Sequence, residues 1–325
     1  MSTATNVTQQ SSKKITKIFG QYTGTLFGLF ALCLFLAIAN QNFLKPNNLM
    51  NIIEQVSYIA ITAFGMTAVL IIGNIDLSVG SIMGLAGTVM ALALQMSIPA
   101  PISLLLAVGV GILCGSFNGF LTAFLSIPAF IVTLATMGIF RGIIYSLTKG
   151  RSVPIDNDFI LSIGMGRFLG VPISVWLLLI FAIIAYFFLQ HLKWGRRAYI
   201  MGGNYEAARH VGINVKNMTL QVFIFAGFMA SIGGIIATSR VWSAQPNLGI
   251  AWELDAIAAA VLGGTSLTGG KGRILGTLIG ALIIGVINNG MNLLSVEAYY
   301  QPIVKGFVIL LAVWVDVKSQ ANKRH

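Results

Sequence analysis

The feature that most constrains this chain is a succession of long apolar segments separated by short polar ones. A helix that crosses the hydrocarbon core of a bilayer needs roughly 20 mostly apolar residues. We count about ten candidate spans: 22–39, 56–73, 78–95, 101–125, 127–147, 171–190, 218–241, 254–268, 274–297 and 299–316. The eighth candidate is short enough to be a partial or broken span, and the exact bounds stay open, above all for the third and the eighth. The sequence therefore predicts an all-α fold, a polytopic transmembrane helical bundle.

The composition agrees with a membrane location. Hydrophobic residues make up 56% of the chain and charged residues only 9%, whereas a soluble domain carries about 25% charge. No stretch outside the apolar runs is long enough to form an ATPase or another catalytic domain. The net charge of +11 comes from basic residues in short loops and at the termini. Basic residues in such positions set the orientation of a membrane protein in the bilayer, so we expect no nucleic acid as a partner. The expected partner of this surface is the lipid bilayer.

Clusters of lysine and arginine predict the topology, because short cytoplasmic loops are enriched in these residues. Such clusters lie in the first residues, in 191–217 and at the end of the chain, and an even number of predicted spans separates each from the next. One assignment therefore puts all three in the cytoplasm, together with Lys271 and Arg273. The sequence predicts a cytoplasmic tail (1–21), a transmembrane domain (22–316) and a second cytoplasmic tail (317–325).

Two glycine-rich interruptions lie between predicted spans, at 73–80 and at 263–272. Irregular backbone at membrane depth is tolerated only where protein or a water-filled cavity satisfies its polar groups. Each interruption is therefore either a discontinuous helix near the translocation path or a tight cytoplasmic turn between two spans. The residues that would break the helices are Asp76, Ser78, Gly80, Gly263 and Gly264.

Asp76 and Arg141 are the charged residues that the predicted spans place nearest to the membrane interior. An acid at such a depth is by default a functional candidate, as a proton or ion relay. The parity of the spans instead places Asp76 near the cytoplasmic side, where it can cap the following helix, and we favour this structural role. Arg141 lies near the outer end of its span, from which its side chain can reach the interface.

The segment 191–217 contains a short predicted helix on the cytoplasmic side. Asn204 is a favourable N-cap, Glu206 lies in the first turn, and Gly212 suits the left-handed position after the last turn. A helix of about two turns is not stable alone in water. It persists only when it packs against something, which is either a partner protein or its own transmembrane bundle.

Several segments are similar to one known family. The pattern Glu206-Ala207-Ala208 followed by Gly212 resembles the signature of permeases that work with a substrate-binding protein. Segments 74–81 (NIDLSVGS), 253–259 (ELDAIAA) and 262–267 (LGGTSL) resemble the permeases of bacterial ABC-type monosaccharide importers, and ribose permeases and their relatives most of all. The resemblance covers nearly the whole chain and is densest from 195 to 316.

The resemblance implies the partners and the mechanism. In this family the short cytoplasmic helix is a coupling helix that docks on an ATP-binding ABC subunit. A periplasmic sugar-binding protein delivers the sugar, and a second copy of the permease, or a close homologue, completes the pore. The sugar, and the choice between homodimer and heterodimer, stay open. The coupling residues are Asn204, Glu206, Ala207, Ala208, Arg209 and Gly212.

The sugar path requires hydrogen-bonding side chains without strong charge. Each candidate for it, an asparagine within a predicted span, is equally well placed to join helices to one another. Aromatic and polar residues around the short loop near 242–252 can meet the binding protein, although an interfacial aromatic belt also explains the tryptophans. The pore-lining candidates are Asn118, Asn288, Asn289 and Asn292, and the docking candidates are Arg240, Trp242, Gln245, Trp252 and Glu253.

Enzymatic chemistry is not expected. The three histidines show no metal-ligand spacing, and no nucleophile with a base stands at plausible depth, so we expect no metal and no cofactor. The loop around Lys271 lacks the P-loop pattern, since Thr265 stands where the first glycine belongs. The alternative function is an ion- or proton-coupled secondary carrier, or a drug or metabolite exporter. Such a carrier would normally hold an essential charge at mid-membrane.

Overall fold

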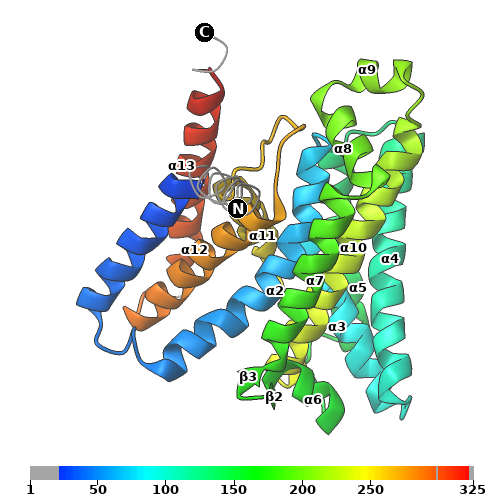
Figure 1. The fold of residues 1–325 in the computed structure, drawn as a ribbon. Helices are drawn as coiled ribbons and strands as arrows, with labels where there is room; N and C mark the ends of the chain where they lie inside the picture. The colour runs from blue at the N-terminus through cyan, green and yellow to red at the C-terminus, as the bar shows by residue number, and fades with distance from the viewer. Residues whose placement is uncertain (1–21, 298, 322–325) are drawn as a thin grey trace, which may run out of the picture.

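The computed structural model describes residues 22–297 and 299–321, and within them it is an α-helical bundle (Figure 1). Among these described residues, seven helices are long and apolar enough to cross a membrane. The strands are two residues each and form two small ladders: β1 (Val153–Pro154) with β4 (Ser243–Ala244), and β2 (Arg167–Phe168) with β3 (Val171–Pro172). The helices are Tyr22–Ala39, α2 (Pro46–Ile71), α3 (Val79–Gln95), α4 (Ala100–Phe124), α5 (Ala129–Thr148), α6 (Asp158–Met165), α7 (Ile173–Gln190), α8 (Lys193–Gly203), α9 (Tyr205–His210), α10 (Val215–Arg240), α11 (Trp252–Leu262), α12 (Ile274–Leu293) and α13 (Gln301–Ala321).

Each predicted span overlaps one of these helices, and the all-α prediction is confirmed. The eighth segment is indeed short, because α11 has 11 residues and ends before Gly263. The second was predicted too short, since α2 begins at Pro46 and not at residue 56. Its first turns are polar, so a hydropathy criterion misses them, but the fixed φ of Pro46 favours a helix start. The predicted tail 1–21 and residues 322–325 lie outside the described residues, and α13 continues to Ala321.

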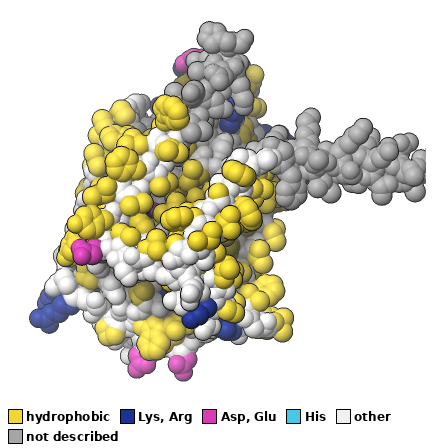
Figure 2. Space-filling model, turned by 90° about the vertical axis from the view of Figure 1, so that its left-hand side faces the viewer, with side chains coloured by type: hydrophobic (Ala, Val, Ile, Leu, Met, Phe, Trp, Pro, Cys, Tyr) yellow, Lys and Arg dark blue, Asp and Glu magenta, His cyan; other side chains and the backbone are white. Residues whose placement is uncertain are grey.

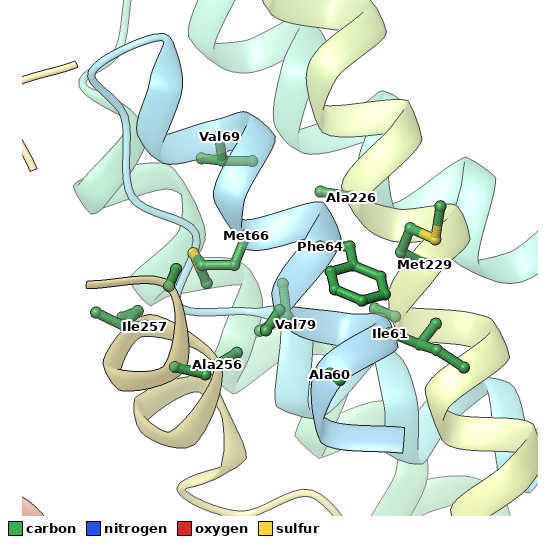
Figure 3. Packing of buried hydrophobic residues seen from close by; sticks show 14 of the residues in the cluster. Ala60, Ile61, Phe64, Met66, Val69, Val79, Ala226, Met229, Ala256 and Ile257 are labelled. Carbon is green, nitrogen blue, oxygen red and sulfur yellow. The ribbon is translucent and has the colours of Figure 1, made fainter. Parts of the chain in front are cut away.

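The core lies along α2. In its most apolar window 83% of the residues are buried, against 11% for the helix Tyr22–Ala39. Figure 3 shows α2 between α10 and α11, with Phe64 facing Ala226 and Met229 of α10. Small residues on these helices allow close approach, which is how helices associate where lipid removes most of the hydrophobic drive.

The outer surface is apolar. Figure 2 shows hydrophobic side chains over most of one face, with charged residues near its lower edge. The helix Tyr22–Ala39 exposes Phe27, Phe30 and Ile38, and α13 exposes Phe307 and Leu310. Surfaces of this kind are stable against lipid or against another membrane helix, and they confirm an integral membrane protein.

We call the two ends of the bundle the α9 end, which carries α8, α9 and the loop 263–273, and the α6 end, which carries α6 and the β-ladders (Figure 1). At the α9 end, burial raises the pKa of Tyr199 to about 12, so its hydroxyl stays protonated and donates to the Gly272 carbonyl at 2.7 Å. The loop is also joined to α2, since Gly270 N–H donates to Ile71 O at 2.8 Å. The basic segments 191–217 and 271–273 therefore share one end, as predicted.

Candidate functional sites

α9 has hydrogen-bonded caps at both ends. Asn204 Oδ1 accepts from Ala207 N–H at 2.9 Å, as the sequence predicts. After the last turn, Gly212 has a φ of +77°, and its N–H donates to Arg209 O while Ile213 N–H donates to Ala208 O, both at 3.0 Å. These paired bonds satisfy carbonyls that the end of a helix leaves free. The caps hold a helix of only 6 residues that would otherwise fray.

α9 presents most of its surface to the outside. Ala208 is buried against the protein, whereas Glu206, Ala207 and Arg209 are exposed, and Glu206 pairs with Arg209 across 3.5 Å on the exposed side. A cavity of 290 Å³ opens beside α9 and is lined in part by Tyr205 and Lys216. A short helix that buries one residue and exposes the others can serve as a docking site for a partner protein.

The interruption between α2 and α3 lies inside the bundle. The chain is non-helical over 72–78, and Figure 3 shows Val79, the first residue of α3, among the buried side chains of the core. Asp76 is fully buried. Its Oδ1 accepts from Ser78 N–H at 2.8 Å and Ser78 Oγ at 2.6 Å, while Asn118 Nδ2 donates to Ser78 Oγ at 2.8 Å. Asp76 thus orders Ser78, the residue before α3. Asn118 lies about 9 Å along the helix axis from the last residue of α4, Phe124.

The second interruption lies at the α9 end. Gly263 and Gly264 follow the last residue of α11, and Gly264 has a φ of +86°. The backbone of Gly263 packs directly on Gly276 of α12, and a Cβ at either position would overlap the other chain segment. The close contact between Gly263 and Gly276 therefore holds the end of α11 against the start of α12, and the loop 263–273 between these helices contacts α8.

The starts of α3 and α11 meet inside the bundle. A Cβ added to Gly80 would overlap the Gly249 carbonyl oxygen and crowd the Glu253 carboxylate. Gly249 itself has a φ of +81° and packs equally closely on Gly80 O. Arg141 holds the same segment, because its Nη1 donates to Pro246 O at 2.8 Å and to Leu248 O at 2.7 Å. The prediction that Arg141 extends to the interface is therefore wrong, since these carbonyls hold its side chain within the protein.

The four candidate asparagines do not form one group. Asn118 belongs to the cluster with Ser78. Asn289 is joined to Asn48 of α2 by reciprocal hydrogen bonds of 2.8 and 3.1 Å, which is the interhelical role that the sequence left open. Asn292 is exposed and accepts from Gln301 Nε2 at 3.0 Å. Only Asn288 touches a charge.

That charge belongs to a buried ion pair that sequence reasoning missed. Lys305 Nζ of α13 lies 2.8 Å from Asp255 Oδ2 of α11, with side chains 14% and 3% exposed. Asn288 Nδ2 lies 3.4 Å from the same oxygen. The sequence predicts only Asp76 and Arg141 as charges near the interior. Both missed residues lie within predicted spans, so inspection of every charge in those ranges would have found them.

The docking candidates lie at or near the α6 end, and only Trp242 among them is exposed. Arg240 Nε lies 3.4 Å from Glu54 Oε2, and its Nη2 donates to Asn51 Oδ1. The Trp252 ring stacks on Tyr58 with centroids 4.9 Å apart. Arg240, Gln245 and Trp252 line a cavity of 260 Å³ in place of an outer surface.

Comparisons with known proteins agree with this architecture. The sequence profile of the family described as branched-chain amino acid transport system / permease component matches residues 48–313. The ribose import permease protein RbsC of Escherichia coli strain K12 is 44% identical over 322 residues, which cover 97% of this chain and 100% of that protein. RbsC of Bacillus subtilis strain 168 is 43% identical, with 93% and 94% covered. The xylose transport system permease protein XylH of Escherichia coli strain K12 is 36% identical, with 87% of each covered.

No solved structure matches the chain. The profile and the relatives nevertheless span most of its length, including α9, both interruptions and the buried ion pair. Proteins of this kind move solutes without catalysing a reaction themselves, which decides against an enzyme. The chain therefore belongs to the branched-chain amino acid transport system / permease component family, and it is a multi-pass permease subunit of an ABC importer in the bacterial inner membrane.

Proposed function

We propose that this permease carries ribose, or a closely related monosaccharide, and that α9 transmits the work of an ATP-binding subunit to the bundle. The cargo is supported by the names of the relatives, ribose import permeases at 43–44% identity and a xylose permease at 36%. An ABC importer permease works in general with an ATP-binding subunit and a periplasmic binding protein. The α9 end then faces the cytoplasm, and the α6 end faces the binding protein.

The observation that carries the proposal is the geometry of α9. Its caps fix a short helix whose Glu206, Ala207 and Arg209 point outward, and the cavity beside it offers room for a side chain of the partner. Ala208 is buried against the protein, so a push on α9 is passed to the bundle instead of being absorbed by a flexible loop. At the opposite end, exposed Trp242 is the docking residue best placed to meet a binding protein.

We further propose that two permease copies, or this chain and a close homologue, enclose the sugar path. The apolar faces of Tyr22–Ala39 and α13 supply surface for lipid and for such a neighbour. Of the four pore-lining candidates, Asn288 and Asn292 have side chains that are not fully buried. They lie one helical turn apart on α12, and we assign them to the path. Asn118 and Asn289 contribute through hydrogen bonds that join the helices around the path.

The test is uptake of radiolabelled D-ribose by proteoliposomes that contain the permease with the ATP-binding subunit and the binding protein of its own system. We expect uptake that requires ATP and both partners. In a background without Cys33 and Cys114, Ala207→Cys should cross-link to the ATP-binding subunit, whereas Leu169→Cys, 79% exposed at the α6 end, should not. Ribose uptake that persists without the ATP-binding subunit, or equal cross-linking at both positions, would contradict the proposal.

A further inference from the structure

We propose that the 260 Å³ cavity between α2, α10 and the segment 245–252 is a monosaccharide-binding subsite on the transport path. This inference rests on the proposed sugar transport and names the place where the permease itself holds its cargo. The volume lies just below the range of about 300–1,000 Å³ for pockets that hold drug-sized molecules. It suits a single sugar ring better than an oligosaccharide.

The cavity has an aromatic wall. Tyr58 of α2 and Trp252 of α11 both line it, and their rings are fixed against each other at 4.9 Å with an interplanar angle of 21°. A rigid aromatic surface contributes contact area with little loss of side-chain freedom, and it accepts the C–H face of a sugar ring. The stack also needs no rearrangement on binding, which lowers the cost of association.

The rest of the lining combines apolar side chains (Ala237, Val241 and Leu248) with polar ones. Gln245 and Asn247 line the cavity and offer donors and acceptors for hydroxyl groups. The cation of Arg240 is offset by Glu54 at 3.4 Å and held by Asn51, so it presents hydrogen-bond donors without an unbalanced charge. This combination suits a neutral polyol. An apolar solute would leave buried polar groups unpaired.

The cavity adjoins a second one that reaches residues of the α6 end, and a close backbone contact bounds its other side. A second cavity of 430 Å³ shares Arg240 and Val241 with it and extends past Glu54 to Arg167. In the opposite direction Gly249 lines the cavity, and its backbone packs directly on Gly80. A sugar that arrives from the α6 end can therefore reach the aromatic wall but cannot pass until the starts of α3 and α11 separate.

The experiment measures sugar binding without the binding protein. The permease, assembled with its ATP-binding subunit in lipid nanodiscs, is titrated with D-ribose and with D-xylose, and saturation-transfer NMR reports the bound ring protons. We expect saturable binding that Trp252→Ala weakens by about tenfold, the effect of losing one aromatic contact. Trp176→Ala, a tryptophan of α7 that does not line the cavity, is the matched control and should bind like the wild type.

Gln245→Ala keeps the test decisive if Trp252→Ala does not assemble. It should change the ratio of D-ribose to D-xylose uptake in proteoliposomes, which a purely structural role would leave constant. Equal binding in wild type, Trp252→Ala and Gln245→Ala, together with an unchanged ratio, would overturn the subsite even if the wild type transports ribose. If the permease binds D-xylose and not D-ribose, and Trp252→Ala weakens that binding, the subsite is supported and the ribose assignment is overturned. Absence of uptake for either sugar by the wild type overturns the proposed function itself.

Discussion

The ion pair between Asp255 and Lys305 allows a quantitative test of how the last helix is held to the bundle. Its atoms lie 2.8 Å apart, and both side chains are nearly enclosed. Coulomb's law with an effective dielectric constant of about 20 gives an attraction of about 6 kcal/mol at 2.8 Å. Desolvation of the two groups offsets much of this, and removal of one partner from a buried pair typically costs about 3–5 kcal/mol.

Lys305→Met should therefore destabilise the permease by about 3 kcal/mol, because it leaves the Asp255 carboxylate without a cation in an apolar setting. Asp255→Asn should destabilise it less, since Lys305 is the more exposed partner and its long side chain can reach water. The double variant should be more stable than Lys305→Met, because it leaves no buried charge without a partner and the amide oxygen at 255 can still accept from Asn288.

The assay is unfolding of the purified permease in mixed micelles of dodecyl maltoside and sodium dodecyl sulfate, followed by tryptophan fluorescence. Lys193→Met is the matched control, since Lys193 is exposed at the start of α8. The reasoning is refuted if the two single effects simply add in the double variant, because additivity means that the residues do not interact. It is also refuted if Lys305→Met unfolds like the control.

Three further substitutions test the other sites. Gly80→Ala should cost about 1–3 kcal/mol or more through overpacking and abolish uptake. Gly138→Ala, whose added Cβ would meet no atom within 4 Å, should have the stability and the uptake of the wild type. Asn204→Ala should remove about 1 kcal/mol of capping from α9, which lower ribose uptake and faster amide exchange in α9 would reveal. Asp76→Asn should retain ATP-driven uptake, because an amide oxygen can still accept from Ser78; loss of uptake with an intact fold would instead indicate a proton or ion relay.

The sequence was sufficient for features that depend on local chemistry. Apolar length located a helix in every predicted span, and the cap residues Asn204 and Gly212 located the ends of α9 to within a residue. The parity of the basic clusters placed 191–217 and 271–273 at one end, which the bond between Tyr199 and Gly272 confirms. Each of these signals is carried by residues that lie close together in the chain.

Features that depend on tertiary contacts were not predictable in the same way. Hydropathy omitted the polar first turns of α2, although Asn48 is held there by Asn289, 241 positions away in sequence. The stack of Tyr58 on Trp252, and the capture of Arg141 by two carbonyls, likewise join segments that no local pattern links. An aromatic belt and an interfacial arginine are reasonable interpretations of single residues, and only the fold shows that the side chains of Trp252 and Arg141 turn inward, whereas Trp242 is exposed.

The contact between Gly80 and Gly249 connects these observations. α3 runs from this contact to the α6 end, and α11 runs from it toward the α9 end, where the loop after α11 is bound to α2 and α8. Discontinuous helices that meet inside a transporter are a recurrent way to gate a path. A displacement of α8 and α9 would thus reach the closed side of the cavity through the loop and α11. Gly80→Ala tests this step directly, because it changes the contact while leaving α9 and the lining side chains in place.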